Sequence, residues 1–140
     1  MSATAIASHE PQLKLSYART QLADLDRLRY VYLASLDGMA QRDIAAAVHL
    51  SQASVHRLIA RARALGVHES IEEIALLRFV GQINTTELLE RLRSFDHWVP
   101  RVVDPSDGVL AEDSEADLDA LLEDGFLSAD EVDQVITAHA

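Results

Sequence analysis

The fold of this chain is decided by residues 41–63, which read QRDIAAAVHLSQASVHRLIARAR. Apolar residues follow helical spacing in two sets on either side of residues 49–51, namely Ile44, Ala45 and Val48, then Val55, Leu58 and Ile59. This pattern predicts two short helices joined by a tight turn. Because two short helices that cross steeply need a small side chain at the crossing, we expect Ala45 at that point.

The turn residues have the conformational preferences that such a break requires. A helix commonly ends on a residue with left-handed backbone, usually Gly, and His is among the few other residues that adopt this conformation at modest cost. His49 occupies that place. Ser51 stands where the second helix begins, and its hydroxyl can accept a hydrogen bond from a free backbone N–H. We therefore expect His49 in the turn and Ser51 as the N-cap.

This stretch resembles the helix-turn-helix of bacterial DNA-binding proteins, with His49 in place of the usual Gly. The resemblance rests on the start of the first helix, the turn and the inner faces, which comprise Gln41, Ile44, Ala45, Leu50, Ser51, Val55 and Leu58. Residues 22–64 also look like the DNA-contacting region of bacterial sigma factors and response regulators. The resemblance implies that the second helix enters the major groove of double-stranded DNA. The alternative is an amphipathic helical hairpin that binds no DNA.

The helical period leaves polar side chains on the outer face of the second helix. Near the start of such a helix, Gln and Arg can make bidentate contacts to adenine and guanine, so we expect Arg57, and next Gln52, to contact bases. Ser51, Ser54 and Arg42 are better placed for phosphate. The complete set of candidate DNA-binding residues is Gln41, Arg42, Ser51, Gln52, Ala53, Ser54, His56, Arg57 and Arg61. A solvated face is the alternative for each.

The net charge of −11 argues at first against a nucleic-acid ligand, because phosphate neutralisation supplies much of the affinity for DNA. The charge is unevenly distributed, however. Residues 1–68 sum to +3, whereas residues 102–140 contain 12 carboxylates and neither Lys nor Arg. An asymmetry of this size indicates two different tasks on one chain.

Helical periodicity extends well beyond the helix-turn-helix. Apolar residues recur at intervals of three and four over residues 13–36, which predicts a long amphipathic helix that forms the third wall of a small core. Capping-box spacing at Ser70 and Asn84 predicts a second helical hairpin, which either completes the core or forms a homodimer interface. The spacing of a third capping box begins at Ser128.

Pro100 and Pro105 rule out a continuous helix and mark a boundary. We therefore expect an all-α fold: a helix-turn-helix domain with a second helical hairpin and an acidic C-terminal helical segment. The expected divisions are a mobile tail over residues 1–12, the helix-turn-helix domain over residues 13–100, and the acidic segment over residues 101–140.

The acidic segment has apolar residues at helical spacing, which disordered tails lack. Its pattern over residues 118–136 is similar to the tails of helix-turn-helix antitoxins, which are encoded beside toxins and repress their own promoters. An acidic segment with spaced apolar residues can bind a basic groove on a partner. The expected partner-binding residues are Leu118, Leu121, Leu122, Phe126, Leu127, Val132 and Ile136. Self-packing on the protein's own core and inhibition of the DNA-binding face are the alternatives.

Residue types that support catalysis or export are missing or scattered. The chain has no cysteine, and its six histidines have no metal-site spacing relative to carboxylates. It also has no glycine-rich phosphate loop, no serine elbow, no export signal and no apolar run long enough to span a bilayer. We therefore expect a cytoplasmic protein that is not an enzyme, needs no cofactor, binds no metal and does not contact a membrane.

Together these patterns predict a sequence-specific transcriptional repressor that binds its own operator. The leading hypothesis is an antitoxin that autoregulates its operon and neutralises a cognate toxin through its acidic segment, with homodimerisation left open. One alternative is a stand-alone regulator or sigma-like factor without a toxin. The other is a module that binds only protein.

Overall fold

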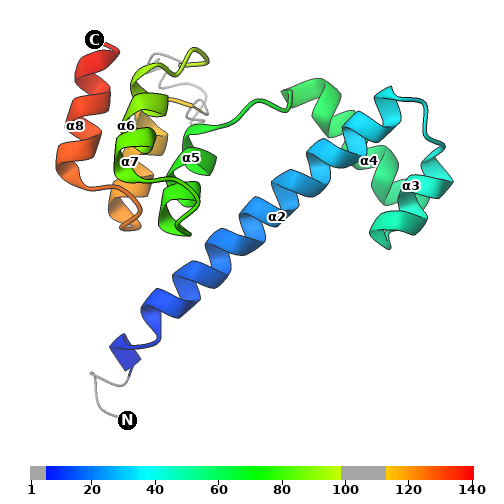
Figure 1. Cartoon of the computed structure of the whole chain (residues 1–140), viewed down its shortest axis with the longest axis horizontal. Coiled ribbons are helices and arrows are strands. Elements are labelled where there is room, and N and C mark those ends of the chain that lie inside the picture. The colour runs from blue at the N-terminus through cyan, green and yellow to red at the C-terminus, as the bar shows by residue number, and fades with distance from the viewer. Residues whose placement is uncertain (1–5, 99–112) are drawn as a thin grey trace, which may run out of the picture. The chain divides into compact units, whose positions relative to one another are not determined.

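The computed structural model describes residues 6–98 and 113–140, and these residues form an all-α fold, as predicted (Figure 1). The helices are α2 (Glu10–Leu36), α3 (Gln41–Val48), α4 (Gln52–Leu65), α5 (Ile71–Phe79), α6 (Thr85–Arg93), α7 (Glu115–Glu123) and α8 (Ala129–Ala138). None of the helices in this part of the chain has the length and apolarity needed to cross a membrane.

Contacts divide the chain into two compact units. One unit is Thr20–His68, and the other combines Met1–Arg19 with Glu69–Ala140. Helix α2 is continuous, but its residues belong to both units. Residues up to Arg19 group with Glu69–Ala140, and residues from Thr20 onward belong to Thr20–His68. Below, the two are called the turn unit (residues 20–68) and the hairpin unit (residues 1–19 and 69–140).

The turn unit has its own small apolar core. The core brings together one residue of α2, two of α3 and two of α4, which are Val31, Ile44, Ala45, Val55 and Ile59. All five are buried, Ala45 among them, in keeping with the need for a small side chain where two helices meet. The apolar periodicity of residues 41–63 is therefore the packing pattern of this unit.

Arg29 of α2 holds the segment that follows α4. Its Nε donates to the carbonyl oxygen of Val67 at 3.0 Å, and its Nη2 donates to that of His68 at 3.2 Å. These carbonyls follow the last turn of α4, where backbone acceptors lack partners within the helix. Arg29 thus links the C-terminal side of α4 to α2.

The hairpin unit consists mainly of two helical hairpins, α5–α6 and α7–α8 (Figure 1). Helix α5 also packs on α7, and α6 also packs on α8. The hairpins share one pattern at an offset of 44 positions, seen in the pairs Ser70 and Ser114, Gly81 and Gly125, Asn84 and Ser128, and Glu87 and Glu131. Each serine or asparagine of these pairs is an N-cap whose side chain accepts from a backbone N–H in the first turn of its helix.

The division into units differs from the expected boundary at residue 100. Residues 69–98 group with residues 113–140, because the apolar residues of α5 surround most of that helix and need α7 as well as α6 to cover them. The expected tail also ends earlier, since α2 begins at Glu10 with Pro11 in its first turn, where a missing N–H has no cost. Pro100 and Pro105 lie outside the described residues.

Candidate nucleic-acid interface

The turn between α3 and α4 has the predicted geometry. His49 ends α3 with φ 56° and ψ 42°, which is the left-handed conformation expected there. The backbone N–H groups of His49 and Leu50 both donate to the carbonyl oxygen of Ala45, the second at 3.0 Å. These bonds satisfy a carbonyl of the last turn of α3 and set the direction in which the chain enters α4.

Ser51 is the N-cap of α4, as its position in the sequence predicted. Its backbone is extended, and its Oγ accepts from the Ser54 N–H at 3.0 Å. At its other end α4 stops at Gly66, whose N–H donates to the carbonyl oxygen of Ala62 at 2.9 Å. The 14-residue helix Gln52–Leu65 therefore begins and ends where its local sequence indicates.

The outward face of α4 is lined by small side chains around one long cationic side chain. The inward face consists of Val55, Ile59 and Ala62, all buried. At 100° per residue, the positions opposite to them are Ala53, Arg57, Ala60 and Ala64, all exposed. Methyl groups at three of these four positions allow a ligand surface to approach the helix backbone closely, with the Arg57 side chain projecting from the middle.

Three side chains at the start of α4 form a connected hydrogen-bond chain. The Ser51 hydroxyl donates to Ser54 Oγ at 2.9 Å, and Nη2 of Arg57 donates to the same Ser54 Oγ at 3.1 Å. The serines and the arginine had been expected to make separate contacts with DNA. Sequence analysis did not predict this link, although the three-residue spacing from Ser54 to Arg57 on a helix places the two side chains side by side.

The other candidate DNA-binding residues are exposed on the same two helices, and no hydrogen bond joins them to this chain of three. They are Gln41 and Arg42 on α3, and Gln52, Ala53, His56 and Arg61 on α4. Arg42 leaves 79% of its side chain accessible, with Nε 3.8 Å from Asp43 Oδ1. At that distance and exposure the ion pair contributes little, so the guanidinium can turn toward another anion.

The two units differ in the sign of their net charge. The turn unit holds six arginines and four aspartates, a net charge of +2, whereas the hairpin unit carries −13. Helix α4 contains Arg57, Arg61 and Arg63 and no acidic residue. The helix-turn-helix candidate therefore lies in the unit with positive net charge.

The expected partner-binding residues of the C-terminal segment lie mostly in the protein's own core. Five are buried, with exposures of 0 to 5%, namely Leu118, Leu121, Phe126, Leu127 and Val132. Ile136 is half-buried, and Leu122 is exposed at 37%. Phe126 contacts the rings of Tyr17 and Phe79, at centroid distances of 6.1 and 4.9 Å. In this fold the self-packing alternative accounts for the buried residues, and Leu122 is the apolar side chain accessible to a partner.

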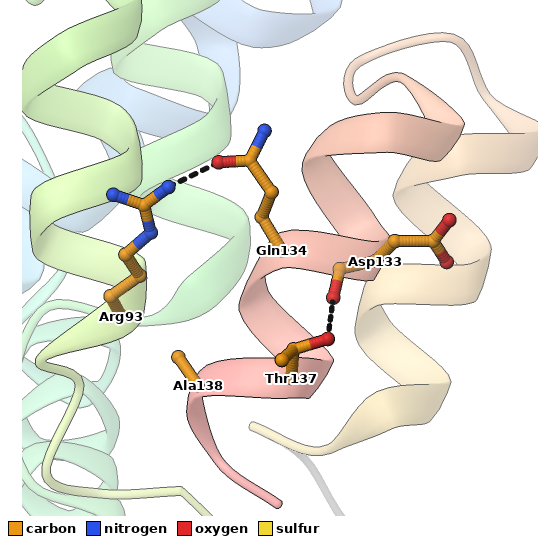
Figure 2. A pocket seen from close by; sticks show the side chains of 5 residues that line it. All are labelled: Arg93, Asp133, Gln134, Thr137 and Ala138. Atoms are coloured by element: carbon orange, nitrogen blue, oxygen red, sulfur yellow. Dashed lines mark hydrogen bonds between the residues drawn. The ribbon is translucent and has the colours of Figure 1, made fainter.

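A shallow groove lined by polar side chains lies between α6 and α8 (Figure 2). It encloses about 420 Å³, is open to solvent and is lined by Arg93, Asp133, Gln134, Thr137 and Ala138. Figure 2 shows Arg93 pointing to the amide oxygen of Gln134, to which it donates a hydrogen bond, while Thr137 donates to the Asp133 carbonyl at 2.8 Å. The Arg93–Gln134 bond crosses the groove from α6 to α8, whereas the Thr137 bond lies within α8, so the groove has the character of a helix-packing seam.

Comparison of the chain with protein-family models, with curated proteins and with solved structures found no match.

Proposed function

We propose that this protein is a sequence-specific repressor that binds double-stranded DNA, with α4 as the helix that enters the major groove. The observation that carries the proposal is the outward face of α4, where Arg57 projects from a strip of alanines. The major groove admits an α-helix, and an arginine can bind guanine O6 and N7 there in a bidentate manner. The alanine methyl groups keep the helix close enough for that contact and can pack on thymine methyl groups.

The remaining polar residues fit contacts to the DNA backbone. Ser51 and Ser54 lie at the N-terminus of α4, where the helix dipole favours a phosphate. Arg42, at the start of α3, and Arg61, one turn beyond Arg57, are exposed cations. In such complexes phosphate contacts position the protein and base contacts supply specificity. Binding is accordingly expected to weaken steeply with salt.

For the hairpin unit we propose a protein partner with a basic surface, as for an antitoxin that neutralises its toxin. Support comes from the charge of −13 and from exposed carboxylates on and beside α7 and α8, which are Asp119, Glu123, Asp124, Asp130 and Asp133. Because the apolar residues of these helices are mostly buried, the contact surface we propose is the carboxylates together with Leu122.

DNA binding is tested with full-length protein and duplexes selected by it from a random library. Affinity is measured by fluorescence anisotropy at two salt concentrations for the wild type, Arg57→Ala and Arg27→Ala. Arg27 is a matched control, since it is an exposed arginine of the same unit paired only weakly with Asp24 at 3.5 Å. We expect Arg57→Ala to remove the preference for the selected duplex and Arg27→Ala to retain it. Enrichment of no sequence by the wild type would reject the proposal.

The partner proposal has a separate test. The product of the adjacent gene, if basic, is titrated with the full chain and with Leu122→Ser. We expect tight binding that weakens with salt and with Leu122→Ser. DNA binding without any such partner would favour the stand-alone regulator. Partner binding without DNA affinity would favour the protein-only module.

A further inference from the structure

The start of α4 contains a hydrogen-bond arrangement whose donors and acceptors can be counted. Ser51 Oγ accepts from the Ser54 N–H and donates to Ser54 Oγ, so both of its roles are in use. Ser54 Oγ accepts twice, from Ser51 and from Arg57 Nη2. A hydroxyl has two acceptor lone pairs and one proton, and the Ser54 proton is therefore directed away from both partners.

The same count shows that most N–H donors of Arg57 remain available to a ligand. The guanidinium has five N–H donors in a rigid planar fork, and the contact with Ser54 at 3.1 Å uses one of them on Nη2. The side chain is exposed, and without this contact it would sample many rotamers in solution. A single bond from one end of the fork fixes the direction of the group while leaving donors for a bidentate contact.

We infer that Ser54 is a positioning residue for Arg57, and that Ser51, Ser54 and Arg57 form a preorganised guanine-binding site. This inference rests on the proposed DNA-binding function. Ser54 acts through its acceptor lone pair, which holds Arg57 before DNA arrives and reduces the ordering that recognition of the base requires. Its free proton remains available to a phosphate oxygen.

This role differs measurably from that of a simple phosphate contact. A phosphate contact carries no sequence information, so its loss weakens binding to all duplexes by the same factor. Loss of a positioning contact weakens the complex that contains the correct guanine more than the complex that lacks it. The ratio of the two dissociation constants therefore separates the two roles.

The experiment uses full-length protein, the selected duplex, and the same duplex with the guanine–cytosine pair assigned to Arg57 changed to adenine–thymine. That pair is identified as the position whose preference disappears with Arg57→Ala. The ratio of dissociation constants is measured for the wild type, Ser54→Ala and Ser54→Thr, with circular dichroism to confirm helix content. For the wild type we expect a ratio of roughly 5 to 150, which corresponds to the discrimination of a good bidentate contact.

For Ser54→Ala we expect that ratio to fall about fivefold, as the loss of one hydrogen bond near 1 kcal/mol implies. For Ser54→Thr we expect the ratio to stay within about twofold of the wild-type value. Equal weakening of both duplexes by Ser54→Ala would overturn the inference and assign Ser54 to phosphate alone. An unchanged ratio and affinity would overturn it as well. If the wild type selects no duplex, the proposed function fails first, which distinguishes that result from the other two.

Discussion

Arg78 of α5 and Glu131 of α8 form an ion pair with two contacts, Nη1 to Oε2 at 2.6 Å and Nη2 to Oε1 at 2.9 Å. The arginine also donates to the Phe126 carbonyl at 3.0 Å and to Thr85 Oγ1 at 3.1 Å. Glu131 is the N3 residue of the capping box that begins at Ser128. One arginine of the first hairpin therefore holds the turn and the helix start of the second.

Replacement of Arg78 is expected to destabilise the hairpin unit strongly. Arg78→Ala leaves a carboxylate that is only 10% exposed without its cation, and removal of one partner of a buried pair is costly. We expect a loss of about 2 to 4 kcal/mol in the free energy of unfolding. Urea unfolding followed by the fluorescence of Trp98 measures it, because this single tryptophan stacks on His139 within the same unit at 4.5 Å.

Arg93→Ala is the matched control for Arg78→Ala. Arg93 lies on α6 of the same unit, is exposed, and donates to Gln134 rather than to a carboxylate. Its loss is expected to cost under about 0.5 kcal/mol, as for most surface substitutions. Equal losses for the two arginines would show that the Arg78–Glu131 pair does not join the hairpins energetically.

Acid is expected to weaken the hairpin unit through Glu131. The hydrogen bonds from Arg78 hold the pKa of this carboxyl below its ordinary value of 4.5, against the opposing effect of burial. A carboxyl whose pKa is lower in the folded state stabilises the fold fully above its unfolded pKa, and this contribution disappears as the pH falls through the folded pKa. The free energy of unfolding due to Glu131 should therefore decline below about pH 4.5.

Glu131→Gln isolates this contribution from those of the other carboxylates. Glutamine retains the capping box and can still accept from Arg78, but it does not titrate. We expect the stability difference between the wild type and Glu131→Gln to shrink as the pH is lowered from about 7 to about 3, as measured by urea unfolding at each pH. A difference that is independent of pH would contradict the lowered pKa.

The left-handed turn residue His49 offers a stabilising substitution. At φ 56° a residue with a Cβ is strained, whereas glycine is not, so His49→Gly is expected to raise the stability of the turn unit by about 0.5 to 1 kcal/mol. Ala46→Gly, at an exposed position inside α3, is the control and should cost about 1 kcal/mol. Thermal unfolding followed by circular dichroism distinguishes the two, and destabilisation by both would refute the expected relief of strain.

Local features of this chain could be predicted because their causes lie within a few residues. The left-handed conformation of His49 and the Ser51 cap depend only on their immediate neighbours, and both were confirmed. The capping box at Ser128 was confirmed for the same reason. The outward exposure of Arg57 also followed, since the apolar period alone determines which side of α4 faces the core.

Long-range relationships could not be derived from the sequence. Arg78 lies inside an apolar run, and nothing near it indicates its partner, because Glu131 lies 53 residues later. Lys14 and its acceptor Asp124 are 110 residues apart, and their contact explains why the first part of α2 belongs with the hairpins. Periodicity indicates which face of a helix is covered but not which helix covers it, and so the grouping of residues 69–98 with residues 113–140 could not be derived from it.

The repeated hairpins allow the Lys14 contact to be tested against an internal control. Gly125 and Gly81 occupy equivalent positions with φ +82° and +84°, so an alanine is strained by its backbone to the same extent in both. A Cβ at Gly81 meets no atom within 4 Å, whereas a Cβ at Gly125 would lie 2.9 Å from Lys14 Nζ. That ammonium donates to the Asp124 carbonyl at 2.7 Å, at the C-terminal end of α7 where a cation is favourable.

Gly125→Ala should therefore destabilise the hairpin unit more than Gly81→Ala, because only the first substitution displaces Lys14 from its acceptor. We expect an excess of about 1 kcal/mol, the value of one hydrogen bond at a partly exposed site. In a Lys14→Ala background the excess should vanish, since no ammonium remains to be displaced, and the double-mutant cycle in urea measures this coupling. Were the excess to persist without Lys14, its cause would lie in the backbone around Gly125, and the contact between α2 and α7 would contribute nothing to it.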